Sequence, residues 1–123
     1  MNTKVKNGLL AIVATTLMAC PSPFFVVNNL QAPSPPVSVT ENENFNLYLA
    51  RGTAPEADWT IKNQPDPQVA QFIEKFNDLA FPTSTGYRFK AVSAGQTSVV
   101  FELVQNDETL EKTFTITVKK GND

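Results

Sequence analysis

The sequence predicts a mainly β fold, an antiparallel β-sandwich that carries one short helix. Two observations predict the strands: apolar and polar residues alternate in short runs, and turn-forming residues separate these runs. A third observation predicts the helix, because one stretch repeats its apolar residues every three or four positions. Alternation buries one face of each strand and leaves the other in solvent, as in antiparallel sheets. The alternating runs span residues 37–40, 45–50, 57–62, 87–92, 99–104 and 113–118.

The helix is predicted at residues 67–80. Asp66 is a suitable N-cap, and Pro67 suits the first helical position. The apolar side chains at helical spacing form a stripe, which we interpret as core packing rather than as a partner site. The stripe consists of Val69, Phe72, Ile73, Phe76 and Ala80.

The number and spacing of the strands favour an immunoglobulin-like sandwich over residues 37–120. Trp59 lies in the third alternating run, where such folds commonly bury a tryptophan. We therefore expect Trp59 in the core, and the alternative is that it stacks on a ligand.

Residues 1–19 are predicted to be a lipoprotein signal peptide. Lys4 and Lys6 precede an apolar segment, residues 8–19, which is shorter than the roughly 20 residues of a membrane-spanning helix. Residues 17–20 read LMAC and resemble the bacterial lipobox, which places a large aliphatic residue three positions before a cysteine and a small residue directly before it. The resemblance implies that Cys20 is acylated and starts the mature protein. The chain would then be exported and lipid-anchored to the cell membrane or the outer membrane; the alternative is an ordinary signal peptide with an incidental cysteine.

Residues 20–36 are predicted to be a Pro-rich spacer between the anchor and the domain, because proline keeps a chain extended. The segment Phe24–Val27 reads FFVV, which is unusually apolar for a spacer. We expect it to dock on the domain as an extra edge strand, and the alternative is that it lies near the lipid.

The composition argues against several classes of function. The chain has no histidine, one cysteine and a net charge of −2 at pH 7. Histidine is the commonest general base and metal ligand, and nucleic-acid binding needs a basic patch. The acidic pairs, Glu41 with Glu43 and Asp107 with Glu108, are interpreted as solvated turn residues. We therefore predict no catalysis, no metal site, no cofactor and no nucleic-acid partner.

Three features together resemble the chagasin-type cysteine protease inhibitors. They are Trp59 shortly after a loop, the segment YRFKAVSAGQTSVVFEL at 87–103, and KTFTITVKK at 112–120. The resemblance implies an immunoglobulin-like fold with three loops at one end that bind papain-type proteases. The matching loops here are 51–58, 83–86 and 105–109, and they lack the family's Asn-Pro-Thr-Thr-Gly and Arg-Pro-Trp motifs. The candidate binding residues in these loops are Thr53, Pro55, Glu56, Thr85, Gly86, Asn106 and Asp107.

Three functions remain open on the sequence. The first is a non-catalytic binding module, held at the cell envelope through acylated Cys20, that binds a protein partner with its loops. The second, which the family resemblance implies, is an inhibitor of papain-type cysteine proteases. The third is a structural subunit of an envelope assembly, which would dock through a sheet edge or the helix.

Overall fold

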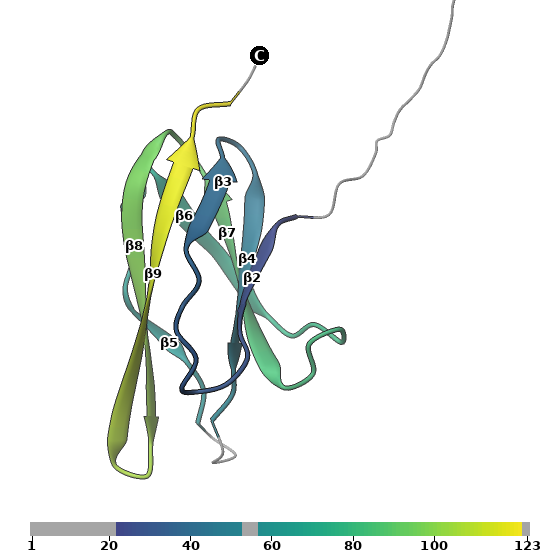
Figure 1. Cartoon of the computed structure of the whole chain (residues 1–123), viewed down its shortest axis with the longest axis vertical. Helices are drawn as coiled ribbons and strands as arrows, with labels where there is room; N and C mark the ends of the chain where they lie inside the picture. Colours follow the sequence, from purple (N-terminus) through teal and green to yellow (C-terminus); the bar gives the residue numbers. More distant parts are fainter. Residues whose placement is uncertain (1–21, 53–56, 122–123) are drawn as a thin grey trace, which may run out of the picture.

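A computed structural model describes residues 22–52 and 57–121. Over these residues the chain forms two four-stranded sheets packed face to face (Figure 1). The first sheet has the order β2 (Phe24–Val27), β4 (Asn44–Ala50), β7 (Ser84–Ala91) and β6 (Ala70–Phe76). The second has the order β3 (Val37–Thr40), β9 (Glu108–Lys119), β8 (Gly95–Gln105) and β5 (Thr60–Asn63). The predicted immunoglobulin-like sandwich is confirmed. The described part of the chain contains no helix long and apolar enough to cross a membrane.

The core lies between the sheets and is rich in aromatic rings. The rings of Phe45 and Phe89 stack in the first sheet with centroids 5.6 Å apart, and Tyr87 reaches across to Phe101 at 4.7 Å. Trp59 is fully buried beside them, so its predicted place in the core is confirmed and it offers no free face for ligand stacking. Its indole N–H donates to the carbonyl of Ala50 at 2.7 Å, which satisfies the polar atom of a buried ring.

Two short strands extend the sheets by parallel pairing. β2 pairs with β4, and β3 pairs with β9, each over four residues, whereas the other pairs are antiparallel. The prediction that Phe24–Val27 docks as an edge strand is therefore confirmed. Because β2 and β3 belong to different sheets, residues 28–36 cross from one sheet to the other and tie the start of the domain to both layers (Figure 1).

The predicted helix at 67–80 is wrong, because residues 70–76 form edge strand β6. The helix-start signal does produce a single turn: the N–H groups of Val69 and Ala70 donate to the Asp66 carbonyl, and the Gln68 N–H donates to its carboxylate. The chain then extends, because β7 has an open edge that backbone N–H and C=O groups of this segment can satisfy.

A bulge in β6 explains why its sequence imitates a helix. The register with β7 shifts between Phe72 and Glu74, so Ile73 is an extra residue that interrupts strict alternation. The Phe72 side chain points inward and packs against Phe89, with ring centroids 5.5 Å apart, whereas Ile73 is 46% exposed. The apolar pair at positions 72 and 73 thus reflects a bulge rather than a helical stripe.

Replacing Phe72 and Ile73 separately distinguishes a strand from a helix. We expect Phe72→Ala to lower the free energy of unfolding by about 1–2 kcal/mol, less than for a fully buried ring because Phe72 is half-buried. Ile73→Ala should change it by less than about 0.5 kcal/mol. Urea denaturation measures both values, and equal losses would instead support a helical stripe in which the two side chains share one buried face.

Candidate protein-binding end

Three connections lie at one end of the sandwich, as the strand pairing requires. Ala50, the last residue of β4, pairs with Ser84 at the start of β7, so residues 51–59 leave the first sheet where residues 77–83 enter it. In the second sheet Thr60, at the start of β5, pairs with Glu102, close to the turn at 106–107. We call the described residues of these connections the loop end: 51–52, 57–59, 77–83 and 106–107. In Figure 1 the turn at 106–107 lies at the bottom of the molecule, and the 77–83 connection projects to the right above it.

The turn between β8 and β9 is short and well defined. Gln105 pairs with Glu108, which leaves Asn106 and Asp107 as a two-residue turn, and both have positive φ, 51° and 63°. These angles belong to a type I′ turn, in which asparagine and aspartate are favoured residues. The sequence placed Asn106 and Asp107 in a loop, and the structure puts both at the tip of this hairpin.

The other candidate residues fall elsewhere. Thr53, Pro55 and Glu56, like Cys20, lie outside the described residues. The predicted loop at 83–86 is wrong for Thr85 and Gly86, because both are buried within β7. Thr85 is 1% exposed, and the connection between β6 and β7 is instead residues 77–83.

Gly86 belongs in the strand because a ring covers it. A Cβ at position 86 would lie 2.6 Å from the ring of Phe76, so only a residue without a side chain lets this ring lie flat on β7. Residues 84–86 are therefore the covered start of β7 rather than an exposed loop, whereas Thr83 is exposed.

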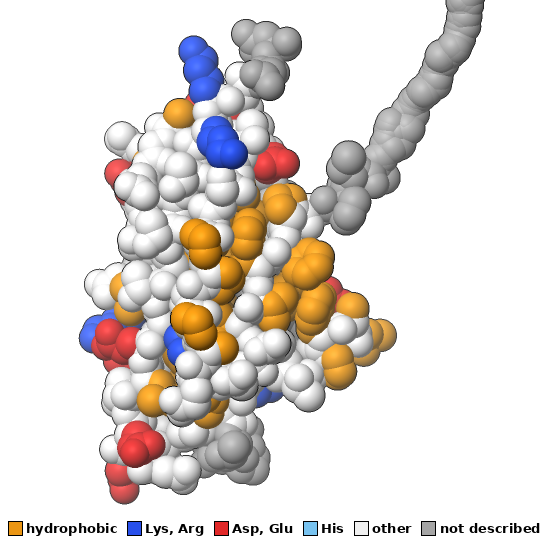
Figure 2. All heavy atoms as spheres, in the orientation of Figure 1, with side chains coloured by type: hydrophobic (Ala, Val, Ile, Leu, Met, Phe, Trp, Pro, Cys, Tyr) orange, Lys and Arg blue, Asp and Glu red, His pale blue; other side chains and the backbone are white. Residues whose placement is uncertain are grey.

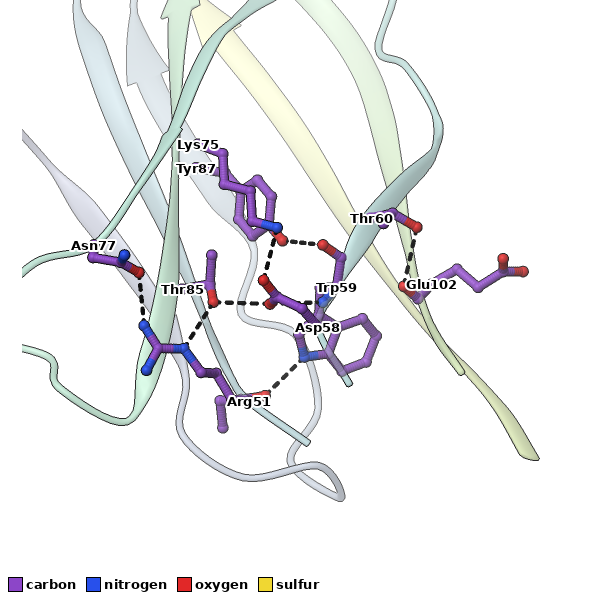
Figure 3. A network of polar contacts seen from close by, with 10 residues as sticks. Arg51, Asp58, Trp59, Thr60, Lys75, Asn77, Thr85, Tyr87 and Glu102 are labelled. Carbon is purple, nitrogen blue, oxygen red and sulfur yellow. Dashed lines mark hydrogen bonds and ion pairs between the residues drawn. The ribbon is translucent and has the colours of Figure 1, made fainter. Parts of the chain in front are cut away.

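Arg51 joins two of the three connections. Its Nη2 donates to Asn77 Oδ1 at 2.7 Å (Figure 3). Its Nη1 donates to the Pro82 carbonyl at 3.1 Å, so one guanidinium holds both ends of the 77–83 connection. Its Nε donates to Thr85 Oγ1 at 3.2 Å, and its backbone N–H donates to the Thr83 carbonyl. The planar fork of arginine suits such a bracing role because its donors are fixed relative to one another.

Asp58 continues the same network on the other side of Thr85. The Thr85 hydroxyl donates to Asp58 Oδ1 at 2.9 Å, the Trp59 N–H donates to the same oxygen, and Lys75 Nζ lies 2.7 Å from Oδ2 (Figure 3). Burial opposes ionisation of this carboxyl, but the bonds from Lys75, Thr85 and the Trp59 N–H outweigh burial and lower its pKa. Asp58 therefore remains a carboxylate that connects the 51–59 connection to β6 and β7.

Two further contacts complete the base of the loop end. The Tyr87 hydroxyl donates to the carbonyl of Trp59, and burial raises the pKa of Tyr87, so this donor keeps its proton. Gly52 allows the chain to pass close to β8, because a Cβ there would lie 2.4 Å from Gln105 Oε1 and 2.8 Å from the Ala57 Cβ. The 51–59 and 77–83 connections thus share one hydrogen-bonded base, and Gly52 brings the first of them close to Gln105 at the end of β8.

The polar side chains of this network bond to one another and to the backbone. The functional groups of Arg51 and Asp58 bond to the protein itself and hold loops in place on a rigid scaffold. Among residues 22–52 and 57–121, no three His, Cys, Asp or Glu side chains are placed to hold a metal ion. Sequence reasoning named the range 51–58 but missed Arg51, Asp58 and Asn77 individually. A weak signal was present at Asp58, which lies between the buried apolar residues Ala57 and Trp59.

Solved structures of other proteins are similar to this one. A cysteine protease inhibitor, EhICP2, from Entamoeba histolytica matches with a TM-score of 0.58 and 9% identity, over 82% of this chain and 100% of that one. The chain has the fold of a chagasin-type inhibitor. Amebosin matches over 81% of this chain and 100% of that one, at 11% identity and a TM-score of 0.48.

A third match is part of a much larger protein. An endo-fucoidan hydrolase of glycoside hydrolase family 107 matches with a TM-score of 0.51 and 16% identity, over 82% of this chain but only 13% of the hydrolase. The sequence matches no protein-family model and has no significant match among curated proteins. At these identities the matches to the inhibitor and to the hydrolase establish only the fold, and one fold can serve different activities.

Proposed function

We propose that the chain is a lipid-anchored envelope lipoprotein whose immunoglobulin-like domain is a non-catalytic module that binds a protein partner through its loop end. The observation that carries the binding role is the network of Arg51, Thr85 and Asp58, which holds two connections in one arrangement. Binding loops that are fixed before they meet a partner lose less conformational entropy on association. Such loops on a sandwich scaffold are the usual place for recognition.

The lipobox supports the anchor. An exported chain with a single cysteine gains from acylation, because the modification removes a free thiol and supplies the attachment. Acyl chains contribute about 0.8 kcal/mol per buried CH₂, and two or more of them anchor stably. The anchor would keep the loop end at the envelope without a membrane-spanning helix.

A papain-type cysteine protease is the partner class favoured by a specific observation. The fold match to the inhibitor from Entamoeba histolytica spans the whole of that protein and 82% of this chain. This second candidate function differs from a general binding module in one measurable property. An inhibitor lowers the activity of the protease in proportion to the amount of this protein that is added.

Titration of a papain-type protease with the mature chain tests this candidate. For an inhibitor, activity should fall linearly and reach zero near one equivalent. Arg51→Ala should weaken inhibition at least tenfold, or about 1.4 kcal/mol, because the change removes the two hydrogen bonds of the guanidinium to the 77–83 connection and its bond to Thr85 in β7. Gln96→Ala, an exposed change at the opposite end of β8, is the matched control and should leave inhibition unchanged.

Site-specific photo-crosslinking in the native envelope tests the wider proposal. A crosslinker at Asp107 should give a discrete adduct with one protein, and the same group at Gln96 should not. Identification of the adduct separates a protease from a component of an envelope assembly. Equal adducts from both positions, or none from Asp107, would contradict binding at the loop end.

A further inference from the structure

A cluster of aromatic side chains lies on the outer face of the sheet formed by β2, β4, β7 and β6, beside the 77–83 connection. Tyr48 lies at its centre and stacks on Phe81 with centroids 4.2 Å apart, while Phe76 meets it edge-on at 5.8 Å. The Phe24 ring contacts two of these rings, with its centroid 6.1 Å from that of Tyr48 and 5.5 Å from that of Phe81. We call Phe24, Tyr48, Phe76, Leu79 and Phe81 the aromatic patch. Figure 2 shows apolar side chains gathered on the flank where β2 and the 77–83 connection lie.

The outer members of the patch are strongly exposed. Leu79 is 98% exposed and Phe24 is 53% exposed, whereas Tyr48, which the rings of Phe24 and Phe81 contact, is only 3% exposed. Isolated apolar residues on a surface need no explanation, but a contiguous group of aromatic rings with a fully exposed leucine beside it indicates an interaction site.

Hydrogen bonds fix the turn that presents Leu79. Asp78 accepts from the Ala80 N–H at 2.9 Å and from the Tyr48 hydroxyl at 2.8 Å, and the Phe81 N–H donates to the Asp78 carbonyl. Burial and the neighbouring Asp78 carboxylate raise the pKa of Tyr48 to about 12, so the hydroxyl keeps its proton and remains a donor. Leu79 is therefore held at the tip of a defined turn, and the Asp78 carboxylate beside it is occupied by these donors.

The length of chain before β2 places this patch near the anchor. Phe24 is the first residue of β2 and lies four residues after Cys20. Four extended residues span at most about 14 Å. Residues 20–36 were predicted to be a spacer, but Phe24–Val27 is paired into the sheet. Only the residues before Phe24 therefore remain as a tether between Cys20 and the domain. A domain tethered so closely touches the bilayer with the side from which the tether leaves.

We propose that the aromatic patch rests in the interface of the bilayer, with Phe24 and Leu79 as the residues that enter the lipid. This inference rests on the proposed acylation of Cys20. An apolar surface beside an acyl anchor is stabilised when it is buried at the boundary between headgroups and acyl chains. Because the anchor holds the patch close to the membrane, the effective concentration of lipid around it is high. Even a small apolar surface therefore contacts lipid more readily than a dissolved partner.

The contact is compatible with partner binding at the loop end. In Figure 1 the 77–83 connection projects sideways next to β2, whereas the turn at 106–107 projects along the long axis of the molecule. Lipid would cover the flank of the 77–83 connection and leave Asn106 and Asp107 accessible. The partner surface is then built mainly from the 51–59 connection and the 106–107 turn.

Spin labelling of the lipidated full chain in phosphatidylethanolamine–phosphatidylglycerol vesicles tests the proposal. The sequence has one cysteine, which the acyl group occupies, so Leu79→Cys adds a single reactive thiol at a position that is almost fully exposed. Thr115→Cys, on the exposed face of β9 in the opposite sheet, is the matched control. Collision of each nitroxide with oxygen, which partitions into lipid, is compared with its collision with a water-soluble nickel chelate.

We expect the ratio of oxygen to nickel collisions to be several-fold higher at position 79 than at position 115. Equal ratios in a sample that floats with the vesicles would overturn the lipid contact and leave the anchor intact. Shielding from both reagents, with spin–spin broadening that disappears on dilution with unlabelled chain, would overturn it in favour of a second copy of this chain. Failure of the chain to float with the vesicles would overturn the acyl anchor itself, and with it the membrane contact.

Discussion

Replacing Trp59 with alanine is expected to lower the free energy of unfolding by about 3–5 kcal/mol. The indole is 0% exposed, and its removal leaves a cavity between the sheets. It also removes the donor to the Ala50 carbonyl, which then lacks this partner at the end of β4. A loss of this size is a large share of the roughly 5–15 kcal/mol that stabilises a typical domain, so urea denaturation should show a strongly reduced midpoint.

Two further variants separate the causes of this loss. Trp59→Phe keeps an aromatic ring but removes the N–H donor and part of the volume, so we expect an intermediate loss of about 1–3 kcal/mol. Val104→Ala, at a position that is 58% exposed, should cost less than about 0.5 kcal/mol. A cost for Trp59→Ala as small as that for Val104→Ala would contradict the central place of this ring in the core.

Replacing Asp58 with alanine is expected to cost about 2 kcal/mol at neutral pH, because hydrogen bonds to a charged group contribute more than neutral ones. The change removes the acceptor of the Thr85 hydroxyl and of the Trp59 N–H, and it leaves the Lys75 ammonium without its 2.7 Å partner. Urea denaturation at pH 7 measures the loss. Asn77→Ala, which removes one neutral acceptor of Arg51, is the matched control and should cost about half as much.

The contribution of the Asp58 charge should depend on pH in a defined direction. Its pKa is lowered in the folded state, so the stabilisation is present above the unfolded carboxyl pKa of about 3.9 and is lost as the pH falls through the folded value. The stability difference between the native chain and Asp58→Asn, which keeps the shape without the charge, should therefore narrow below about pH 4. A difference that stays constant from pH 7 into this range would show that the charge makes no contribution.

Much of the fold could be predicted because apolar alternation directly reflects a sheet with one buried face. Phe45 and Leu47, or Phe114 and Ile116, alternate with polar residues and are fully buried in the structure. Trp59 was predictable for the same reason, since it lies in phase with such a run. The docking of Phe24–Val27 followed from the excess of apolar residues in an otherwise Pro-rich segment.

The helix prediction failed because a bulge changes the phase of a strand. Ile73 is the extra residue, and it brings Phe72 and Phe76 to a spacing that a helix would also give. Pairing with β7 decided the outcome, and that pairing depends on residues distant in sequence. Local spacing alone carries no information about an open sheet edge.

The braced loop end was hidden from the sequence for a related reason. Arg51 contacts residues that lie 26 to 34 positions away, so no local motif marks it. Thr85 and Gly86 are residue types that are common in loops. In the structure, however, Thr85 is buried opposite Leu49, and Gly86 lies under the Phe76 ring. Only the three-dimensional arrangement distinguishes these residues from exposed turn residues.

Mass spectrometry of the mature chain from its native envelope tests most directly the claim that this sandwich works while attached to a bilayer. We predict a chain that starts at Cys20 and carries the added mass of a diacylglycerol on its sulfur, with or without a further acyl group on its amine. A first residue at any other position, or an unmodified sulfur at Cys20, would contradict the lipid anchor and the membrane contact that depends on it.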